Sequence, residues 1–251
     1  MPAHRVPAGR PRSRRSLSLI GGLFLLTALL PAGVAAAMLR DCSDIQPEPG
    51  AAMQRCDLSG QVIIGMDLHG IRLDAADLTG VNAGCDPDEP RTNLAGSRLP
   101  RATLVGALLC DAILDDALLR AADLRDAALE DATLTQADLT RAVLDGAAAG
   151  FAGFADARMS GASWLDGSAV GARFDRGDLS RSDLRGTNLR AARLVDTVLR
   201  LARLDGVDFT SADLTGADWF GATGLDTAIW SSTTCPDGTN SDGNGGTCVG
   251  H

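Results

Sequence analysis

The six cysteines are the residues with the clearest potential chemistry. They lie at Cys42, Cys56, Cys85, Cys110, Cys235 and Cys248. An even number of cysteines in an exported chain indicates disulfides, although six cysteines allow fifteen pairings. We favour pairing between neighbours in the sequence, which joins Cys42 to Cys56, Cys85 to Cys110 and Cys235 to Cys248. Zinc is the competing interpretation, but the chain has no C-x-x-C motif and few histidines, so disulfides are preferred.

A second group of possible ligands lies between the last two cysteines. Asn240, Asp242 and Asn244 follow the spacing of the first half of a calcium-binding loop. The twelfth position of such a loop requires a bidentate Glu, and here it is His251. We therefore interpret the segment as a turn-rich, disulfide-closed loop and keep calcium as an alternative.

No set of residues suggests catalysis. Tyrosine is absent, and the histidines are isolated from one another. Many aspartates alternate with arginines, as around Arg181, Asp183, Arg185 and Arg193, and such surface pairs contribute little energy. We expect neither an enzyme nor a cofactor.

The part of the chain that must hold these residues in place has a sequence pattern that repeats every five residues. From Leu94 to Ile229, 28 centre positions recur every five residues, and 18 of them are Leu. Two residues before each centre the side chain is small, most often Ala. Five matches neither the 3.6-residue period of a helix nor the two-residue period of a strand, so the pattern indicates a repeat architecture.

Units such as Ala122-Asp123-Leu124-Arg125-Asp126 match the pattern A-[DN]-L-x-x, which resembles the pentapeptide repeat family. The resemblance implies an all-β fold, a right-handed quadrilateral β-helix in which four units form one coil. Centres and small residues would point inward and the other three positions outward. With an upstream block at Leu58, Ile63, Leu68, Leu73 and Leu78, and Ala83 as a sixth centre, we expect about eight stacked coils.

The core pattern is irregular in one belt. The centres Ala149 and Ala169 are small, whereas Phe154, Met159, Trp164 and Phe174 are large. We expect small centres on one wall to make room for large ones on the others, because close-packed cores conserve volume.

The N-terminus predicts a signal segment. Five arginines precede an apolar stretch from Leu17 to Leu30, and Ala35-Ala36-Ala37 offers a cleavage site. The apolar stretch is too short for a stable transmembrane span. The pair Arg14-Arg15 leaves both twin-arginine and general secretion open. Removing this segment takes the formal net charge from −9 to −14, which disfavours direct nucleic-acid binding.

An acidic insertion, residues 84–91, interrupts the register with Asp86, Asp88 and Glu89 beside two prolines. Outward positions Leu108, Ile113 and Leu118 nearby are unexpectedly apolar. We expect the insertion, tethered through Cys85 and Cys110, to cover part of this apolar patch. The alternative is that the patch is an interaction surface for a protein partner.

The expected organisation therefore has six parts. These are a signal peptide (1–37), an N-terminal cap segment (38–55), a first repeat block (56–83), the acidic loop (84–91), the main solenoid (92–230) and a disulfide-closed tail (231–251). Trp219, Phe220, Ile229 and Trp230 are expected to form an apolar lid at the C-terminal end.

The favoured function is a non-catalytic, exported scaffold or protein-interaction surface, periplasmic or secreted. Its protein partners and its oligomeric state are not specified by the sequence. A second hypothesis follows from the resemblance, since some family members imitate DNA and bind topoisomerases; the signal segment argues against it. A calcium or small-ligand module at the C-terminal loop is the third.

Overall fold

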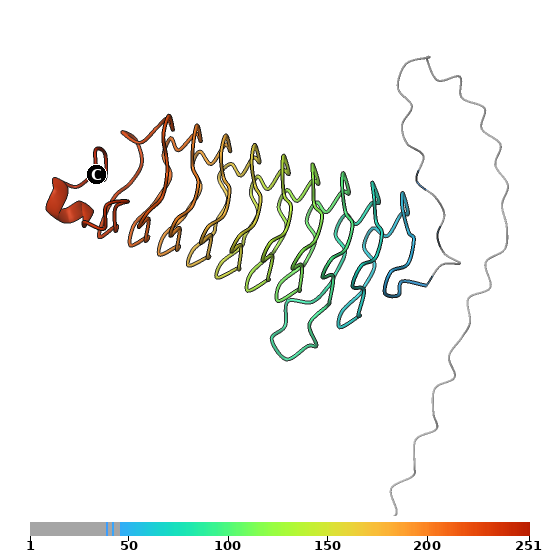
Figure 1. Cartoon of the computed structure of the whole chain (residues 1–251). Coiled ribbons are helices and arrows are strands. Elements are labelled where there is room, and N and C mark those ends of the chain that lie inside the picture. Colours follow the sequence, from blue (N-terminus) through green and yellow to red (C-terminus); the bar gives the residue numbers. More distant parts are fainter. Residues whose placement is uncertain (1–38, 40–41, 43–45) are drawn as a thin grey trace, which may run out of the picture. The chain divides into compact units, whose positions relative to one another are not determined.

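Residues 46–251 of the computed structural model form a rod of stacked coils (Figure 1). The structure describes residues 39, 42 and 46–251, so the expected signal peptide lies outside the described residues. The one helical element in the described part is η1, a short 3-10 helix at Ser241–Asn244. None of its helices is long and apolar enough to cross a membrane.

Each coil has four walls, and each wall is a column of parallel β-bridges. Wall 1 runs from Ala52 to Asp218, wall 2 from Asp57 to Thr223, wall 3 from Val62 to Ile229 and wall 4 from Asp67 to Thr234. Successive members of a column, such as Asn93 and Ile113, are usually separated by one full coil of four five-residue units. Every column contains nine members, so the rod has nine levels rather than about eight, and it begins before residue 56.

The bridges remain isolated because a turn follows every centre. At most corners the backbone N–H three residues after the centre bonds back to the centre's carbonyl, as from Ser97 to Leu94 at 3.1 Å. The residue before that donor has a positive φ, 62° at Gly96 and 59° at Arg141, which is the geometry of a type II turn. The four turns of a coil therefore close it into a square, with each strand reduced to a single paired residue.

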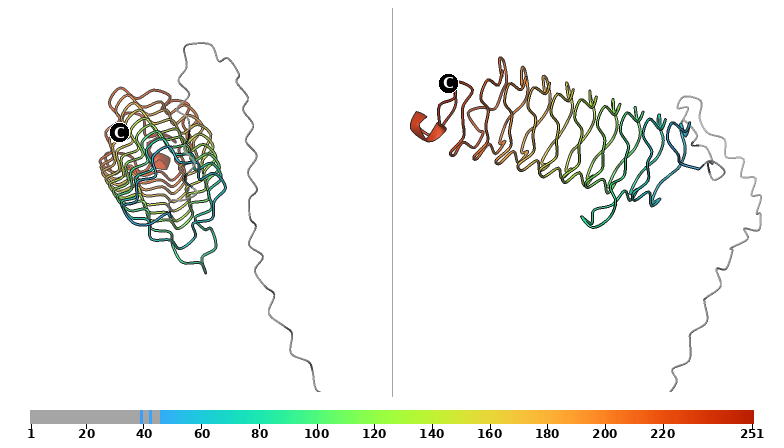
Figure 2. Two further views of the ribbon diagram at one scale, coloured as in Figure 1. Left: turned by 90° about the vertical axis from the view of Figure 1, so that its right-hand side faces the viewer. Right: turned by 60° about the horizontal axis from the view of Figure 1, so that its bottom comes forward.

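The core follows the predicted five-residue pattern. Centres from Leu94 to Leu214 are at most 2% exposed, and nearly all the residues two positions before them are buried too. Viewed near its axis, the rod shows the coils superposed around this common interior (Figure 2). A single unit cannot bury its Leu, so stability comes from stacking, as in other solenoids.

The irregular belt packs as the volume argument predicts. Phe154 and Phe174, both on wall 4, stack with ring centroids 5.0 Å apart. Trp164 reaches them from wall 2, meeting both rings edge-on at 5.7 and 6.1 Å. The small centres Ala149 and Ala169 belong to wall 3, and the Trp164 indole N–H donates to the Ala147 carbonyl on that side at 3.2 Å.

The register differs from the prediction at the C-terminal end. Ile229 lies in the bridging column of wall 3, one position further from Asp208 than a full coil would place it, and is 51% exposed. One extra residue at the turn after Thr223 shifts the pattern, so Trp230 is the centre that follows Phe209. Thr234 pairs with Asp213, and Cys235 is a fully buried centre. The last coil thus continues past residue 230, and Ile229 is not a core position.

The expected apolar lid is only partly formed. Trp219 and Trp230 pack edge-on with centroids 5.8 Å apart, and Trp230 stacks on Phe209. Phe220, in contrast, is 78% exposed. The two tryptophans, not all four residues, cover this end of the core.

Candidate interaction surface

The three disulfides tie the ends and the acidic insertion to the rod. They join Cys42 to Cys56, Cys85 to Cys110 and Cys235 to Cys248, the pairs favoured from sequence proximity. Cys56 and Cys235 occupy inward positions of the first and last coils. The disulfides that they form therefore link the chain before the first coil and the C-terminal tail to the two ends of the core. Cys85–Cys110 joins the insertion to the next coil.

The insertion is a defined loop at the corner between walls 3 and 4. The bridged pair Asp67 and Asn93 has a sequence separation of 26, whereas Asp115 and Thr135, one regular coil apart, have a separation of 20. Six residues have therefore been added to one turn. Thr92 closes the base of the loop. The single proton of its buried hydroxyl is shared between the carbonyls of Ala83 at 2.7 Å and Ile63 at 3.0 Å, and the hydroxyl oxygen accepts from the Gly65 N–H at 3.0 Å.

The expected apolar patch is not formed. Leu108 belongs to wall 3, Ile113 to wall 4 and Leu118 to wall 1, so the three side chains face in different directions. Leu108 and Leu118 are 40% and 37% exposed, so the loop does not cover them as expected. Residues five apart in this fold lie on successive walls, whereas neighbours on one wall are a full coil apart.

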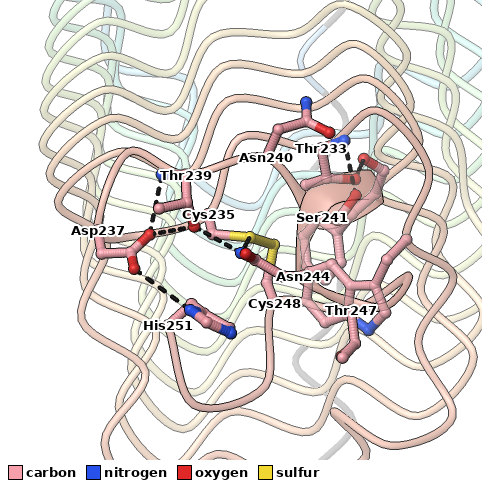
Figure 3. Close-up of a disulfide and its surroundings, with 12 residues drawn as sticks. Thr233, Cys235, Asp237, Thr239, Asn240, Ser241, Asn244, Thr247, Cys248 and His251 are labelled. Atoms are coloured by element: carbon pink, nitrogen blue, oxygen red, sulfur yellow. Dashed lines mark hydrogen bonds and ion pairs between the residues drawn. A yellow bond between two sulfur atoms is a disulfide. The ribbon is translucent and has the colours of Figure 1, made fainter.

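The calcium candidates serve the structure of the tail (Figure 3). The Asn240 side chain caps η1 by accepting from the Asp242 N–H at 2.9 Å. Asp242 accepts from the N–H and hydroxyl of Ser232 at 2.8 and 3.0 Å. The Asn244 amide donates to the Thr239 hydroxyl at 2.5 Å. The three side chains therefore do not converge on one ion.

Within the described part of the chain, no three His, Cys, Asp or Glu residues gather as a metal site would require. The tail residues instead connect to one another. In Figure 3, Asp237 accepts from Thr239 and faces His251, and the disulfide lies between these groups and η1. The tail is thus a hydrogen-bonded cap.

Charged side chains on the walls pair mainly between adjacent coils. Arg176 contacts Asp156 at 2.6 Å, and Arg193 contacts the buried Asp175 at 2.8 Å. Hydrogen bonds from Arg176 hold the pKa of Asp156 below its usual range. These pairs are largely solvated, so each contributes little.

Asp183 on wall 2 pairs with two arginines. It accepts from Arg185 within its own coil and from Arg203 one coil away. Burial alone would raise the pKa of Asp183, but the hydrogen bond from Arg185 and the charge of Arg203 outweigh it and lower the pKa.

Sequence reasoning missed a row of arginines at the corner between walls 1 and 2, which we call the basic corner. Its turn positions from residue 100 to residue 201 carry five arginines and no acidic residue: Arg101, Arg120, Arg141, Arg181 and Arg200. A hollow of about 510 Å³ opens there between Arg120, Arg141 and Arg181. The sequence does contain a signal for the basic corner, because arginine recurs at an interval of two coils at Arg101, Arg141 and Arg181.

A second cavity, of about 680 Å³, lies at the N-terminal end of the core. Met53, Ile63 and Leu68 are among its apolar lining residues. Leu39, Cys42 and Pro47 also line it, so it lies between the segment before residue 50 and the first coils.

Comparison with solved structures finds other repeat proteins. One is HetL, a pentapeptide repeat protein involved in heterocyst differentiation regulation from the cyanobacterium Nostoc sp. strain PCC 7120. HetL is 26% identical over 79% of this chain and 95% of its own, with a TM-score of 0.49. Full-length QnrB1, a plasmid-mediated fluoroquinolone resistance protein, is 15% identical over 69% of this chain and 93% of its own, with a TM-score of 0.31.

A further similar structure is the pentapeptide repeat protein Rfr23 from the cyanobacterium Cyanothece 51142. It is 19% identical over 65% of this chain and 90% of its own, with a TM-score of 0.27. Comparison with curated proteins finds no match.

The family model for pentapeptide repeats matches in eight copies, at residues 91–126, 122–163, 152–190 and 182–218. Together these ranges cover residues 91–218, about half of the 251 residues. With the five-residue centres, the four-walled coil and this match, the chain belongs to the pentapeptide repeat family, whose fold is a right-handed β-helix.

Proposed function

We propose that this protein is an exported, non-catalytic scaffold that presents a rigid interaction surface outside the cytoplasm. The three disulfides carry the proposal, because structural disulfides persist in oxidising compartments and are rare in the cytosol. The arginine-rich, apolar segment of residues 1–37 supports export, and periplasmic and secreted destinations both suit it.

The scaffold role is supported by the shape and packing of the rod. Its interior is filled by Leu, Ala and aromatic side chains, and its outward residues are held at fixed intervals by the backbone bridges. A stacked solenoid offers a long, stiff surface of this kind. Catalysis needs polar groups that converge in a pocket, and the charged residues described above face outward along the walls and corners.

Export is tested by producing the full chain with its own leader in a bacterial host. We expect a shortened protein in the non-cytoplasmic fraction whose cysteines resist alkylation until a reductant is added. A variant with Arg14→Lys and Arg15→Lys distinguishes the routes, since it should block twin-arginine export and leave general secretion intact. Full-length protein retained in the cytoplasm with alkylated cysteines would contradict the proposal.

The partner is sought by cross-linking and pull-down of the mature protein from the envelope fraction. Recovery of cytoplasmic partners alone would contradict an extracytoplasmic scaffold.

DNA imitation is a weaker candidate for this chain. A DNA mimic needs a continuous negative surface facing a cationic site, and here the basic corner interrupts the acidic ones. An effect of the mature protein on gyrase supercoiling would restore this candidate. Calcium binding is likewise disfavoured, because the oxygens of Asn240 and Asp242 already accept hydrogen bonds within the tail.

A further inference from the structure

The basic corner differs in charge from the corner opposite it. Because the walls follow one another around a square, the corner between walls 1 and 2 lies diagonally across from the corner between walls 3 and 4. The latter, which we call the loop corner, carries Asp111, Glu130 and Asp131 together with the acidic loop. Arg190 also lies at the loop corner, where it contacts Asp208. Up to Asp131 the loop corner is therefore mainly acidic, and it lies opposite the basic corner.

The hollow in the basic corner has arginines that are free to pair. Arg120 already contacts Asp138 at 2.9 Å. Arg141 and Arg181 are exposed and make no ion pair or side-chain hydrogen bond to any residue the structure describes. Gly161 lies between them, one coil from each, and its lack of a side chain leaves the space open. Thr140 and Ser160 supply hydroxyl groups beside it.

The acidic loop is the complementary element. Its tip is a turn in which the Glu89 N–H bonds to the Asp86 carbonyl at 2.9 Å, and Asp86 accepts from the Asp88 N–H at 3.0 Å. Asp88 and Glu89 are exposed, and neither has a cationic partner in the part of the chain that the structure describes. Figures 1 and 2 show the loop projecting from the side of the rod.

The loop is held in place before any partner binds. Cys85–Cys110 anchors its start, and the Arg91 guanidinium donates to the Asp111 carbonyl at its end, at 2.5 Å. Pro90 packs over Gly65, where no side chain is present. A pre-organised loop loses little conformational entropy on docking, which favours binding.

We propose that the acidic loop of one molecule docks in the arginine-lined hollow of a second copy. Asp88 and Glu89 would pair with Arg141 and Arg181, whose planar guanidinium groups suit carboxylates. The net negative charge of the chain opposes association at long range, but at physiological salt the Debye length is about 8 Å. The ion pairs at the contact therefore keep their attraction, whereas the repulsion between the net charges of the two molecules is screened.

The positions of the two elements determine the kind of assembly. The loop and the hollow lie on opposite corners, so a single interface cannot contain both from the same molecule. The contact is therefore heterologous, and heterologous contacts that do not close by rotation form open chains. The mass of the assembly should rise with concentration beyond a dimer.

The test is sedimentation of the oxidised mature protein at increasing concentration. The loop variant Asp88→Arg/Glu89→Arg and the hollow variant Arg141→Glu/Arg181→Glu should each weaken association at least about tenfold, because like charges then face each other. An equimolar mixture of the two should restore association, since the cationic loop meets an acidic hollow and the acidic loop meets a cationic one.

The control is Arg125→Glu/Arg185→Glu, which changes the net charge as much as the hollow variant but acts at the corner between walls 2 and 3. It should associate as the unmodified protein does, and circular dichroism should show all variants folded. A protein that stays monomeric at every concentration, a closed dimer, a mixture that fails to recover, or a control that loses association would each overturn the proposal.

Discussion

The rings of Phe209 and Trp230 stack with centroids 5.0 Å apart and an interplanar angle of 12°. They are neighbours on wall 3, yet their sequence separation exceeds a full coil by one position. This contact, together with the bridge from Asp208 to Ile229, shows that the last coil contains one extra residue and that Trp230 replaces Ile229 as its centre.

Trp230→Ala should therefore lower the free energy of unfolding by about 3 kcal/mol, as for other large aromatic truncations. Ile229→Ala is the matched control, because Ile229 is 51% exposed, and its effect should stay within about 0.5 kcal/mol. Urea unfolding of both variants measures the difference. An equal loss in both would contradict the shifted register.

Thr92→Val should destabilise the protein by about 1–3 kcal/mol, although the two side chains have similar shapes. The substitution removes the hydroxyl proton that the Ala83 and Ile63 carbonyls share, and it leaves the Gly65 N–H without its acceptor. Thr79→Val, at an exposed position, should be nearly neutral. Thermal unfolding of the pair, together with protease sensitivity of residues 84–91, provides the measurement.

Gly167→Ala should destabilise the rod even though it brings the unit closer to the family pattern. An added Cβ would overlap the Trp164 indole and approach the Ala147 carbonyl at 2.8 Å. Overpacking of this kind typically costs about 1–3 kcal/mol.

Gly153→Ala supplies the control within the same belt, because a Cβ there meets no atom within 4 Å. It should be neutral or stabilising, by up to about 1 kcal/mol. If both alanine variants were equally stable, the close packing of Trp164 against Gly167 would be refuted.

Replacing Cys85 and Cys110 together by serine should lower the free energy of unfolding by about 3 kcal/mol in the loop-entropy model, since 25 residues separate the two cysteines. The acidic loop should also become a site of proteolytic cleavage. Limited proteolysis of the oxidised protein and the variant compares the two. Unchanged cleavage and stability would mean that Thr92 and Pro90 hold the loop without the disulfide.

The attachment of the C-terminal tail should depend on acid pH. The Ser232 N–H, followed by its hydroxyl, lowers the pKa of Asp242 in the folded protein. The stabilisation is therefore complete above the ordinary aspartate value of about 3.9, and it is lost as the pH falls through the lower, folded value.

An NMR titration of the Asp242 carboxyl measures this directly. Ser232→Ala should move the pKa of Asp242 back toward its ordinary value, whereas Ser231→Ala should leave it unchanged. A titration of Asp242 at or above the ordinary value would contradict the observed hydrogen bonds.

The sequence predicted the architecture well because the period of five acts on every unit. Each Leu centre and each small residue before it must face inward, so Leu94 to Leu214 could be assigned from the pattern alone. The disulfide pairs were also accessible, since Cys85 lies in an insertion that must return close to Cys110.

The arrangement of side chains on the surface was harder to predict, because two residues are neighbours on a wall only when about one full coil separates them in the sequence. Leu108, Ile113 and Leu118 look adjacent in the sequence but lie on three walls. Arg141 and Arg181 look distant but line the same hollow. The extra residue before Trp230 was hidden because Ile229 fits the five-residue count by residue type. The two are distinguished only in the structure, by the bridge from Asp208 to Ile229 and the stacking of Trp230 on Phe209.

The columns of bridges also determine how the rod responds to force. Their hydrogen bonds run along the rod axis. A force that pulls the two ends of the rod apart therefore acts on only a few of these bonds at a time, and the coils detach one after another. Each released coil of four five-residue units would add about 66–72 Å of extended chain, except in the segment that Cys85 and Cys110 close. The loop closed by Cys235 and Cys248 cannot be drawn out in this way, so the C-terminal tail would resist stretching while the coils beneath it yield.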